Sequence, residues 1–399
     1  MQTCLNKVSF LAGNPRDIEE LKTLPPMTPF SDEAVSLLND VSKLLMKNRA
    51  AKGYPDVITI AFWIRKNSVL SLRSRFIKDD SQFRIGRGVA FHIAPSNVPV
   101  NFAYSLAAGI LSGNINIVRI PSKDFEQVSL IADAINNALS EHPEFKGYIN
   151  LVRYERDREI NDLFSAMADI RIIWGGDNTI AELRRSPLKP RATEITFADR
   201  YSVAVIDSGF YLEAQDKKRI AEDFYNDTFL TDQNACTSPR IVIWTGGRVK
   251  EAKEIFWEEE RKIVKERYGF QPIQAVNKLN SALLLGAAIP GCRVLEHEDN
   301  LIIRISVDKP SPELMDYRDN SGFFFEYDCQ DIMEIRPLLN DSRCQTAGYI
   351  GEKEMFMPLI RSGIRGTDRI VPVGRTMDFD LVWDGYDLVS AMSREITVL

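Results

Sequence analysis

The sequence predicts an α/β protein with two consecutive α/β domains. Between residues 88 and 206, short apolar segments alternate with helical segments of about 10–15 residues, which is the rhythm of βαβ units. The apolar segments are almost continuously hydrophobic, as parallel strands buried on both faces should be. A second series of the same kind follows, and 399 residues suffice for two or three domains.

The first series predicts a domain at 85–208. Its first strand is followed by Pro95, Ser96 and Asn97, which are typical turn residues. Gly113 and Asn114 are typical of the residues that end a helix, here the one expected at 99–111. The expected strands are 88–94, 115–120, 148–152, 170–174 and 201–206, and the expected helices are 99–111, 124–139, 157–167 and 178–185.

The second series predicts a domain at 209–365. A polar loop at 231–239 separates its first helix from its first strand. The expected helices are 213–230 and 249–268, and the expected strands are 240–244, 301–307, 323–327 and 344–350. The flanking parts are an N-terminal helical segment, 1–84, with helices at 31–48 and 58–76, and a C-terminal segment, 366–399, with a strand at 368–373.

Composition excludes several classes of function. The chain has 50 basic and 56 acidic side chains, a net charge of −6, so a broad nucleic-acid footprint is not expected. The longest apolar run, 282–290, is too short to span a bilayer, and the N-terminus does not resemble a signal peptide. The five cysteines and three histidines lack metal-ligand spacing, so we expect no metal. These features predict a cytoplasmic protein whose thiols stay reduced.

Cys236 is the candidate nucleophile. It lies in the polar segment Asp-Gln-Asn-Ala-Cys-Thr-Ser-Pro-Arg, 232–240, between a helix and a strand. A thiol on such a turn can be activated by backbone N–H groups, whereas the alternative is a structural thiol. Cys292, Cys329 and Cys344 lie in or beside strand-like segments and are interpreted as core residues.

Other candidates stand where strands end, at the edge where open α/β sheets bind ligands. Asn97 can donate to an oxyanion or cap a turn. Arg119 can bind a ribose or a phosphate, or lie free on the surface. Gly175-Gly176-Asp177 opens a helix, where an anion is favoured, although no complete G-x-G-x-x-G motif is present. Glu194 can act as an acid or base, or be a solvated strand carboxylate.

In chain order, these segments resemble the aldehyde dehydrogenase superfamily and, more closely, the LuxC-type acyl-CoA reductases. The resemblance covers about residues 85–399 and rests on Ile-Ala-Pro-Ser-Asn (93–97), Val-Arg-Ile-Pro-Ser (118–122), Ile-Trp-Gly-Gly-Asp (173–177), Glu194, 232–240 and Trp-Asp-Gly-Tyr-Asp (383–387). It implies a Rossmann-like nucleotide-binding domain, an α/β catalytic domain and a small oligomerisation element, with catalysis in the cleft between the two domains.

The resemblance also implies roles for individual residues. Cys236 matches the nucleophile, Asn97 the oxyanion-hole asparagine, and Glu194 the general base of hydrolytic relatives. The glycines that follow this glutamate in relatives are replaced by Thr196 and Phe197. The implied cofactor-binding residues are Pro95, Ser96, Arg119, Pro121, Ser122, Gly175, Gly176 and Asp177.

The implied reaction is the NADPH-dependent reduction of fatty acyl-CoA to aldehyde through a thioester on Cys236. NADH stays an alternative cofactor, although a guanidinium such as Arg119 suits the extra phosphate of NADPH. The alternative functions are an aldehyde dehydrogenase that uses NAD(P) and a non-catalytic subunit of an acyl-transfer complex. The implied partners are acyl-CoA, an acyl-protein synthetase or acyltransferase, and further copies of the chain.

Overall fold

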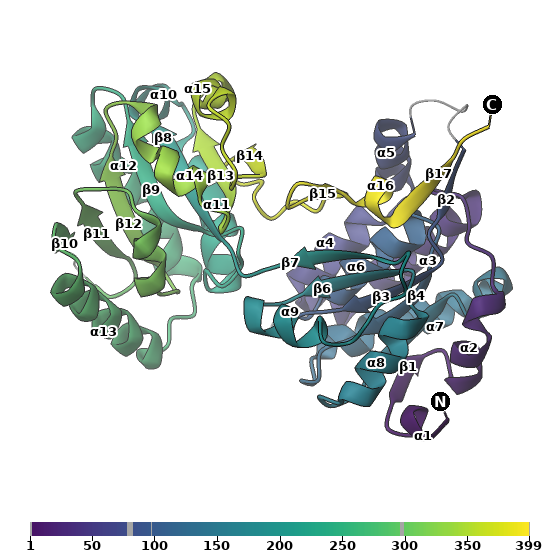
Figure 1. Cartoon of the computed structure of the whole chain (residues 1–399). Coiled ribbons are helices and arrows are strands. Elements are labelled where there is room, and N and C mark those ends of the chain that lie inside the picture. The colour runs from purple at the N-terminus through teal and green to yellow at the C-terminus, as the bar shows by residue number, and fades with distance from the viewer. Residues whose placement is uncertain (1, 78–82, 97, 296–298, 399) are drawn as a thin grey trace. The chain divides into compact units, whose positions relative to one another are not determined.

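The computed structural model describes residues 2–77, 83–96, 98–295 and 299–398. These form two compact units (Figure 1). Unit 1 comprises Met1–Ala198 and Phe379–Leu399, and unit 2 comprises Asp199–Asp378. The chain therefore leaves unit 1, builds unit 2 and then returns to complete unit 1.

Unit 1 is built on a six-stranded sheet in the order β1-β5-β4-β3-β6-β7. All neighbouring strands are parallel except β1, which pairs antiparallel with β5. β3 lies between β4 and β6, so the direction of strand addition reverses there, and this is the topological switch point of an open α/β sheet. The strands are β1 (Ser9–Ala12), β3 (Val89–Ile93), β4 (Ile115–Arg119), β5 (Ile149–Arg153), β6 (Ile170–Trp174) and β7 (Thr193–Phe197).

Helices cover both faces of this sheet (Figure 1). Right-handed crossovers place α6 and α7 on one face and α8 and α9 on the other. The N-terminal helix α3 packs against α4, α6 and α7. The helices are α1 (Gln2–Leu5), α2 (Pro15–Glu20), α3 (Asp32–Lys47), α4 (Pro55–Trp63), α5 (Lys66–Phe76), α6 (Asn101–Leu111), α7 (Glu126–Glu141), α8 (Arg158–Met167) and α9 (Asp177–Leu183).

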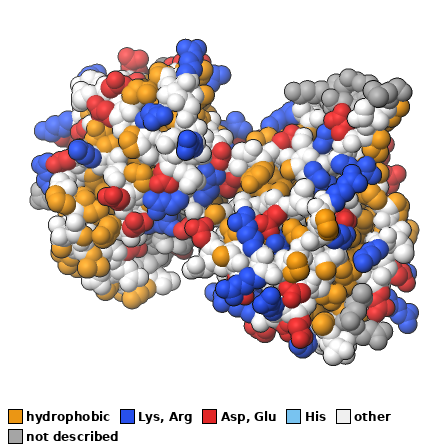
Figure 2. All heavy atoms as spheres, in the orientation of Figure 1, with side chains coloured by type: hydrophobic (Ala, Val, Ile, Leu, Met, Phe, Trp, Pro, Cys, Tyr) orange, Lys and Arg blue, Asp and Glu red, His pale blue; other side chains and the backbone are white. Residues whose placement is uncertain are grey.

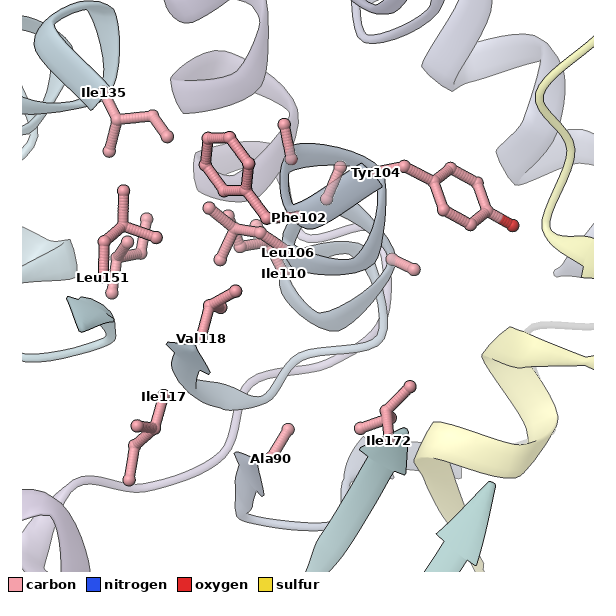
Figure 3. Packing of buried hydrophobic residues seen from close by; sticks show 14 of the residues in the cluster. Ala90, Phe102, Tyr104, Leu106, Ile110, Ile117, Val118, Ile135, Leu151 and Ile172 are labelled. Atoms are coloured by element: carbon pink, nitrogen blue, oxygen red, sulfur yellow. The ribbon is translucent and has the colours of Figure 1, made fainter. Parts of the chain in front are cut away.

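Helix α6 forms the centre of the unit 1 core. It is buried over almost its whole length, and Figure 3 shows its Phe102, Leu106 and Ile110 near side chains of β4 and β5. Each such side chain contributes roughly 1.5–3 kcal/mol when it is removed from water. Tyr104 points away from this group, toward the C-terminal segment (Figure 3). Its hydroxyl donates to the Asp380 carbonyl at 2.6 Å, which ties that segment to α6.

The C-terminal segment completes unit 1 in two places. The rings of Phe379 and Trp383 lie 5.2 and 5.7 Å from that of Tyr104. Farther on, β17 pairs antiparallel with β2. The elements concerned are β2 (Phe83–Gly86), β15 (Val382–Trp383), β16 (Tyr386–Asp387), α16 (Leu388–Met392) and β17 (Ser393–Ile396).

Unit 2 contains a seven-stranded sheet in the order β10-β11-β12-β9-β8-β13-β14. Only β10 is antiparallel to its neighbour. The strands are β8 (Tyr201–Asp207), β9 (Pro239–Thr245), β10 (Cys292–Val294), β11 (Ile303–Val307), β12 (Phe323–Asp328), β13 (Cys344–Ile350) and β14 (Arg369–Pro372).

The two faces of this sheet bury separate cores. Along β8, Val203 and Val205 join the core beneath α13, α14 and α15, whereas Ala204 and Ile206 join the core beneath α10, α11 and α12. This alternation is the period-2 geometry of a strand. The helices are α10 (Ser208–Glu213), α11 (Lys217–Thr228), α12 (Val249–Arg267), α13 (Pro272–Ala288), α14 (Arg336–Asn340) and α15 (Met357–Arg361).

The α/β class with largely parallel sheets is confirmed, whereas several details differ from expectation. The strand expected at 201–206 was assigned to the first domain, but β8 pairs with β9 and β13 in the unit 2 sheet. The helix expected at 213–230 corresponds to α11, which begins only at Lys217, where Asp216 caps it, and ends at Thr228. The segment 1–84 is part of unit 1 and supplies the sheet's edge strand β1.

No helix among the described residues combines the length and apolar character needed to cross a bilayer.

Candidate active site

Cys236 lies on the loop between the short helix η4 (Phe229–Thr231) and β9, and its side chain is half-buried. β9 is an inner strand of the unit 2 sheet. The Ser202 hydroxyl donates to the Cys236 carbonyl at 2.7 Å, and the Thr237 hydroxyl donates to Met377 Sδ at 2.9 Å. The Cys236 carbonyl and the side chain of the next residue are therefore held by residues distant in sequence.

Gln233 fixes the path of the same loop. Asp232 and Gln233 both have positive φ angles, 51° and 58°, a conformation that costs a non-glycine residue about 1–3 kcal/mol. The buried Gln233 amide donates to the carbonyls of Pro239 and Phe323 at 2.9 and 3.1 Å. Its oxygen accepts from the N–H groups of Gly322 and Phe323 at 3.0 and 3.1 Å. These four bonds offset the strain and tie the cysteine loop to β12.

Arg240 places a buried positive charge beside the loop. Its guanidinium donates to the Asp319 carbonyl at 2.8 Å and to Asn320 Oδ1. Burial, helped by the neighbouring Arg318, lowers the pKa of Arg240 to about 10, although Asp199, Cys236 and Asp319 act in the opposite direction. Arg240 is thus cationic at neutral pH, and it attracts negative charge at Cys236.

Asp227 supports the other side of the loop from α11. Its carboxylate accepts from the N–H groups of Gly374 and Thr376 at 2.6 and 3.2 Å. The next residue, Met377, accepts the hydrogen bond from Thr237. Burial raises the pKa of Asp227 from its ordinary value of 3.8 to about 7.

We expect Asp227 to make stability depend on pH. Between pH 4 and pH 7 the folded chain keeps a proton that the unfolded chain has lost, so the free energy of unfolding falls as pH rises, by at most about 1.4 kcal/mol per unit. This loss of unfolding free energy is absent below pH 4 and complete above pH 7. Asp227→Asn should remove this slope in urea unfolding at pH 5, 6, 7 and 8. Glu213→Gln, at an exposed position in α10, should keep it, and equal slopes in all three proteins would contradict the prediction.

The other thiols lie in different surroundings. Burial raises the pKa of both Cys329 and Cys344 to about 12, and both side chains are buried. Cys292 is half-buried on the edge strand β10, and burial raises its pKa as well. These thiols are therefore unreactive at neutral pH.

In unit 1, the predicted cofactor-binding residues gather at the carboxyl ends of three adjacent strands. Pro95 and Ser96 follow β3, and Arg119, Pro121 and Ser122 end or follow β4. Gly175, Gly176 and Asp177 follow β6 and open α9. Since β3 lies between β4 and β6, these residues occupy the switch point. Asn97 lies outside the described residues.

The details of this edge suit a dinucleotide phosphate. The Arg119 guanidinium donates to the Tyr154 carbonyl at 3.2 Å and lies 4.5 Å above the Tyr154 ring, so it is held at the end of β4. A Cβ added to Gly176 would have no heavy atom within 4 Å, so the space beside its backbone is open. Backbone N–H groups and a guanidinium at a switch point are the groups that bind such phosphates.

Glu194 lies elsewhere in unit 1. It is the second residue of β7, near the amino end of the strand and away from the edge just described. Its carboxylate accepts from Arg171 Nε at 2.8 Å and Nη2 at 2.5 Å, and from Arg184 Nε at 2.8 Å. The Arg171 side chain is only 2% exposed. The structure thus groups Glu194 with two arginines and not with Pro95, Ser96 or Gly175.

Sequence reasoning missed Gln233, Arg240, Asp227 and Arg171. Only Arg171 carried a local signal, because an arginine within the apolar run Ile-Arg-Ile-Ile-Trp, 170–174, must be paired when that strand is buried. The roles of the others depend on partners far along the chain.

A sheet with a topological switch point in one unit, and a cysteine loop before an inner strand in the other, are the arrangement of an aldehyde-dehydrogenase-like fold. The glyceraldehyde-3-phosphate dehydrogenase of Methanocaldococcus jannaschii, solved with NADP, matches with a TM-score of 0.66 at 13% identity, over 96% of this chain and 92% of that one. Aldehyde dehydrogenase 21 of Physcomitrella patens matches with a TM-score of 0.65 at 12% identity, over 95% and 88%. At these identities the likeness establishes the fold alone.

The chain belongs to the acyl-CoA reductase (LuxC) family, whose model matches residues 13–266. A long-chain acyl-protein thioester reductase of Aliivibrio fischeri is 25% identical over 303 residues, which are 72% of this chain. The chain spans 58% of the length of that relative.

Proposed function

We propose that the protein reduces a fatty acyl thioester to the aldehyde with NADPH, through an acyl-thioester on Cys236. The observation that carries the proposal is the half-buried Cys236 thiol on a loop fixed by Gln233 and flanked by the cationic Arg240. Membership of the acyl-CoA reductase family supports the same chemistry. A reducing cytoplasm would keep this thiol reduced.

The chemistry needs few protein groups because the substrate is already activated. The Cys236 thiolate attacks the acyl carbonyl, the bond to the donor thiol breaks, and the acyl group remains on the enzyme sulfur. The Asn97 amide and the Cys236 N–H are the proposed donors to the oxyanion. After reduction, the C–S bond breaks and releases the aldehyde and the thiolate. The balance is acyl-SR + NADPH + H⁺ → aldehyde + RSH + NADP⁺.

The unit 1 edge fits the nicotinamide cofactor. Arg119 and Ser122 are proposed to hold its ribose or phosphate groups, and the backbone at Gly175 and Gly176 its pyrophosphate. When bound, the cofactor supplies the hydride. We propose NADPH because a guanidinium binds an extra phosphate in a bidentate fork, and the solved Methanocaldococcus protein holds NADP.

The acyl donor is proposed to be acyl-CoA, as the family description says. The Aliivibrio relative is named for an acyl-protein thioester, so an acylated partner protein is the second donor to test. Both donors present the same thioester carbonyl to Cys236. An acyl-protein synthetase or an acyltransferase would then supply the acyl group.

Intact-mass measurement tests the function directly. The chain is incubated with acyl-CoAs of several lengths, with and without NADPH. We expect an acyl adduct without NADPH, and loss of that adduct, release of free CoA and formation of aldehyde when NADPH is added. If no adduct forms and NADPH absorbance stays constant with every acyl-CoA and with an acylated carrier protein, the proposal is wrong. NADH in place of NADPH tests the cofactor.

The ion pairs of Glu194 lead us to propose that it holds Arg171 rather than moves a proton. A base that activates water would hydrolyse the acyl-enzyme to a fatty acid, so reduction does not need one. We expect Glu194→Gln to lower the free energy of unfolding by about 2–3 kcal/mol, because the buried Arg171 loses its counter-charge. The rate of reduction at a temperature where the variant is folded should fall less than about threefold.

Glu182→Gln is the matched control for this test. Glu182 forms an exposed ion pair with Arg185, with side chains 57% and 66% exposed, so its loss should change stability by less than about 1 kcal/mol. If Glu194→Gln keeps wild-type stability and loses most of its reduction rate, Glu194 is a catalytic residue instead.

A further inference from the structure

Helix α13 of unit 2 has an exposed face made of branched aliphatic side chains. Figure 2 shows hydrophobic side chains gathered over this helix. Each of the five is more than half exposed: Ile273 59%, Val276 53%, Leu279 51%, Leu283 63% and Leu284 65%. Single exposed leucines are ordinary, whereas a contiguous group of this size marks an interaction surface.

The opposite face of α13 is fixed, so the helix cannot rotate to bury these side chains. Ala282 and Leu285 pack into the core beneath the sheet. Between them and the helix start, the buried Lys278 ammonium donates to the carbonyls of Asn300, Leu301 and Ser321 at 2.5, 3.0 and 2.7 Å. Rotation would break all three hydrogen bonds and leave the buried amine without these partners.

The exposed face has the spacing of a helix–helix contact. Ile273, Val276, Asn280, Leu283 and Ala287 follow one another at intervals of three, four, three and four residues, and all are exposed. This is the seam of a helix pair, here called the α13 seam, with one polar position of the kind that sets register.

The same helix has no exposed charge. In a chain with 27% charged residues, Lys278 is the single charged residue of α13, and it is buried. A helix that lies on a membrane surface carries Lys and Arg along its polar face, which α13 does not. An uncharged face meets a copy of itself without repulsion, although the chain carries a net charge of −6.

We propose that two copies of this chain associate through their α13 seams, antiparallel, about a two-fold axis at Asn280. Residues 273 and 287 lie seven positions to either side of 280, so the axis sets Ile273 against the partner's Ala287. Val276, four positions before the axis, then faces the partner's Leu284, four positions after it, and the two Asn280 amides meet at the centre. Large side chains oppose smaller ones, as a self-complementary two-fold interface requires.

The association should be weak. The exposed aliphatic side chains offer roughly 500 Å² on each copy, against about 800 Å² per partner in a stable interface. We expect a dissociation constant on the order of 10 µM, which corresponds to about 7 kcal/mol. The proposal does not depend on the proposed function, because α13 contains none of the residues assigned to it.

Sedimentation velocity between about 1 and 200 µM tests the proposal. The wild-type chain should show a concentration-dependent association step that Leu283→Glu removes. Ile360→Glu, an exposed aliphatic position on α15 at 45%, is the matched control and should behave as wild type. Both variants should keep wild-type reduction of acyl thioesters. A wild-type mass that does not change with concentration, or a step that survives in Leu283→Glu, would overturn the proposal.

A site-specific cross-link tests the axis. Because position 280 meets itself, Asn280→Cys should form a 280–280 disulfide under mild oxidation, identified by peptide mapping. Glu258→Cys, exposed on α12, should cross-link at least about tenfold more slowly. Equal rates would overturn the two-fold arrangement. Hydrogen exchange of α13 completes the test. If α13 is equally protected at every protein concentration, its exposed face is covered by another part of the same chain, and the proposal is wrong.

Discussion

Replacing Cys236 by alanine should lower the reduction of acyl thioesters by at least about a thousandfold, the largest effect on activity expected of any single change. The proposed reaction has no route around the enzyme-bound thioester, because the acyl carbonyl must leave its donor before it is reduced. The acyl adduct seen by intact mass should disappear together with the activity. Stability should change by less than about 1 kcal/mol, because the thiol is only half-buried.

Cys292→Ala is the matched control for this change. Cys292 is likewise half-buried but lies on β10 at the edge of the unit 2 sheet. Its replacement should leave both adduct formation and reduction unchanged. If the adduct and the activity both survive in Cys236→Ala, the nucleophile is another residue. If the adduct is lost and the activity survives, the thioester is not an intermediate.

Replacing Gln233 by alanine should give the largest loss of stability, about 4–6 kcal/mol in unit 2. The change leaves two buried carbonyls and two buried N–H groups without the partners that Gln233 supplies, and each costs about 1–3 kcal/mol. The positive φ angle of residue 233 would also lose the bonds that offset its strain. Reduction should fall with it, because the same side chain sets the path of the Cys236 loop.

Hydrogen exchange measured on individual peptides distinguishes a loss of stability confined to unit 2 from one that affects the whole chain. Peptides of β9 and β12 should lose protection in Gln233→Ala, while those of β4 and β5 in unit 1 should keep it. Asn234→Ala is the control, because Asn234 is exposed and has one hydrogen bond to Asn320. Asn234→Ala should lower the free energy of unfolding by less than about 1 kcal/mol. Wild-type protection of β9 and β12 in Gln233→Ala would contradict the prediction.

Much of the fold could be predicted because apolar runs and turn residues are local signals. β4, β6 and β13 lie within a residue of their expected positions. The sheet to which a strand belongs is not a local property, and β8 shows the difference. Its run, Tyr201 to Ile206, is apolar on both faces like the strands before it, so nothing in the run itself reveals that it pairs with β13, which lies about 140 residues later in the chain.

The candidate site likewise contains some residues that local sequence signals could predict and others that depend on distant partners. Cys236 could be singled out because a thiol among small polar residues is unusual, and the glycines at 175 and 176 because they follow a strand. Asp227 could not, since its partners at 374 and 376 are almost 150 residues away. Glu194 looked like a free carboxylate because the arginines that hold it come from β6 and from the end of α9.

The insertion of unit 2 into unit 1 affects how the chain folds as it is synthesised. About 180 residues of unit 2 separate the two parts of unit 1, and at 5–20 residues per second the ribosome needs roughly 10–40 s to make them. During that time β2 lacks β17, and the Tyr104 ring lacks Phe379 and Trp383. Unit 2 can therefore fold first although it is translated second, and the nascent unit 1 presents an open strand edge and unburied aromatic rings to chaperones until the last twenty or so residues emerge.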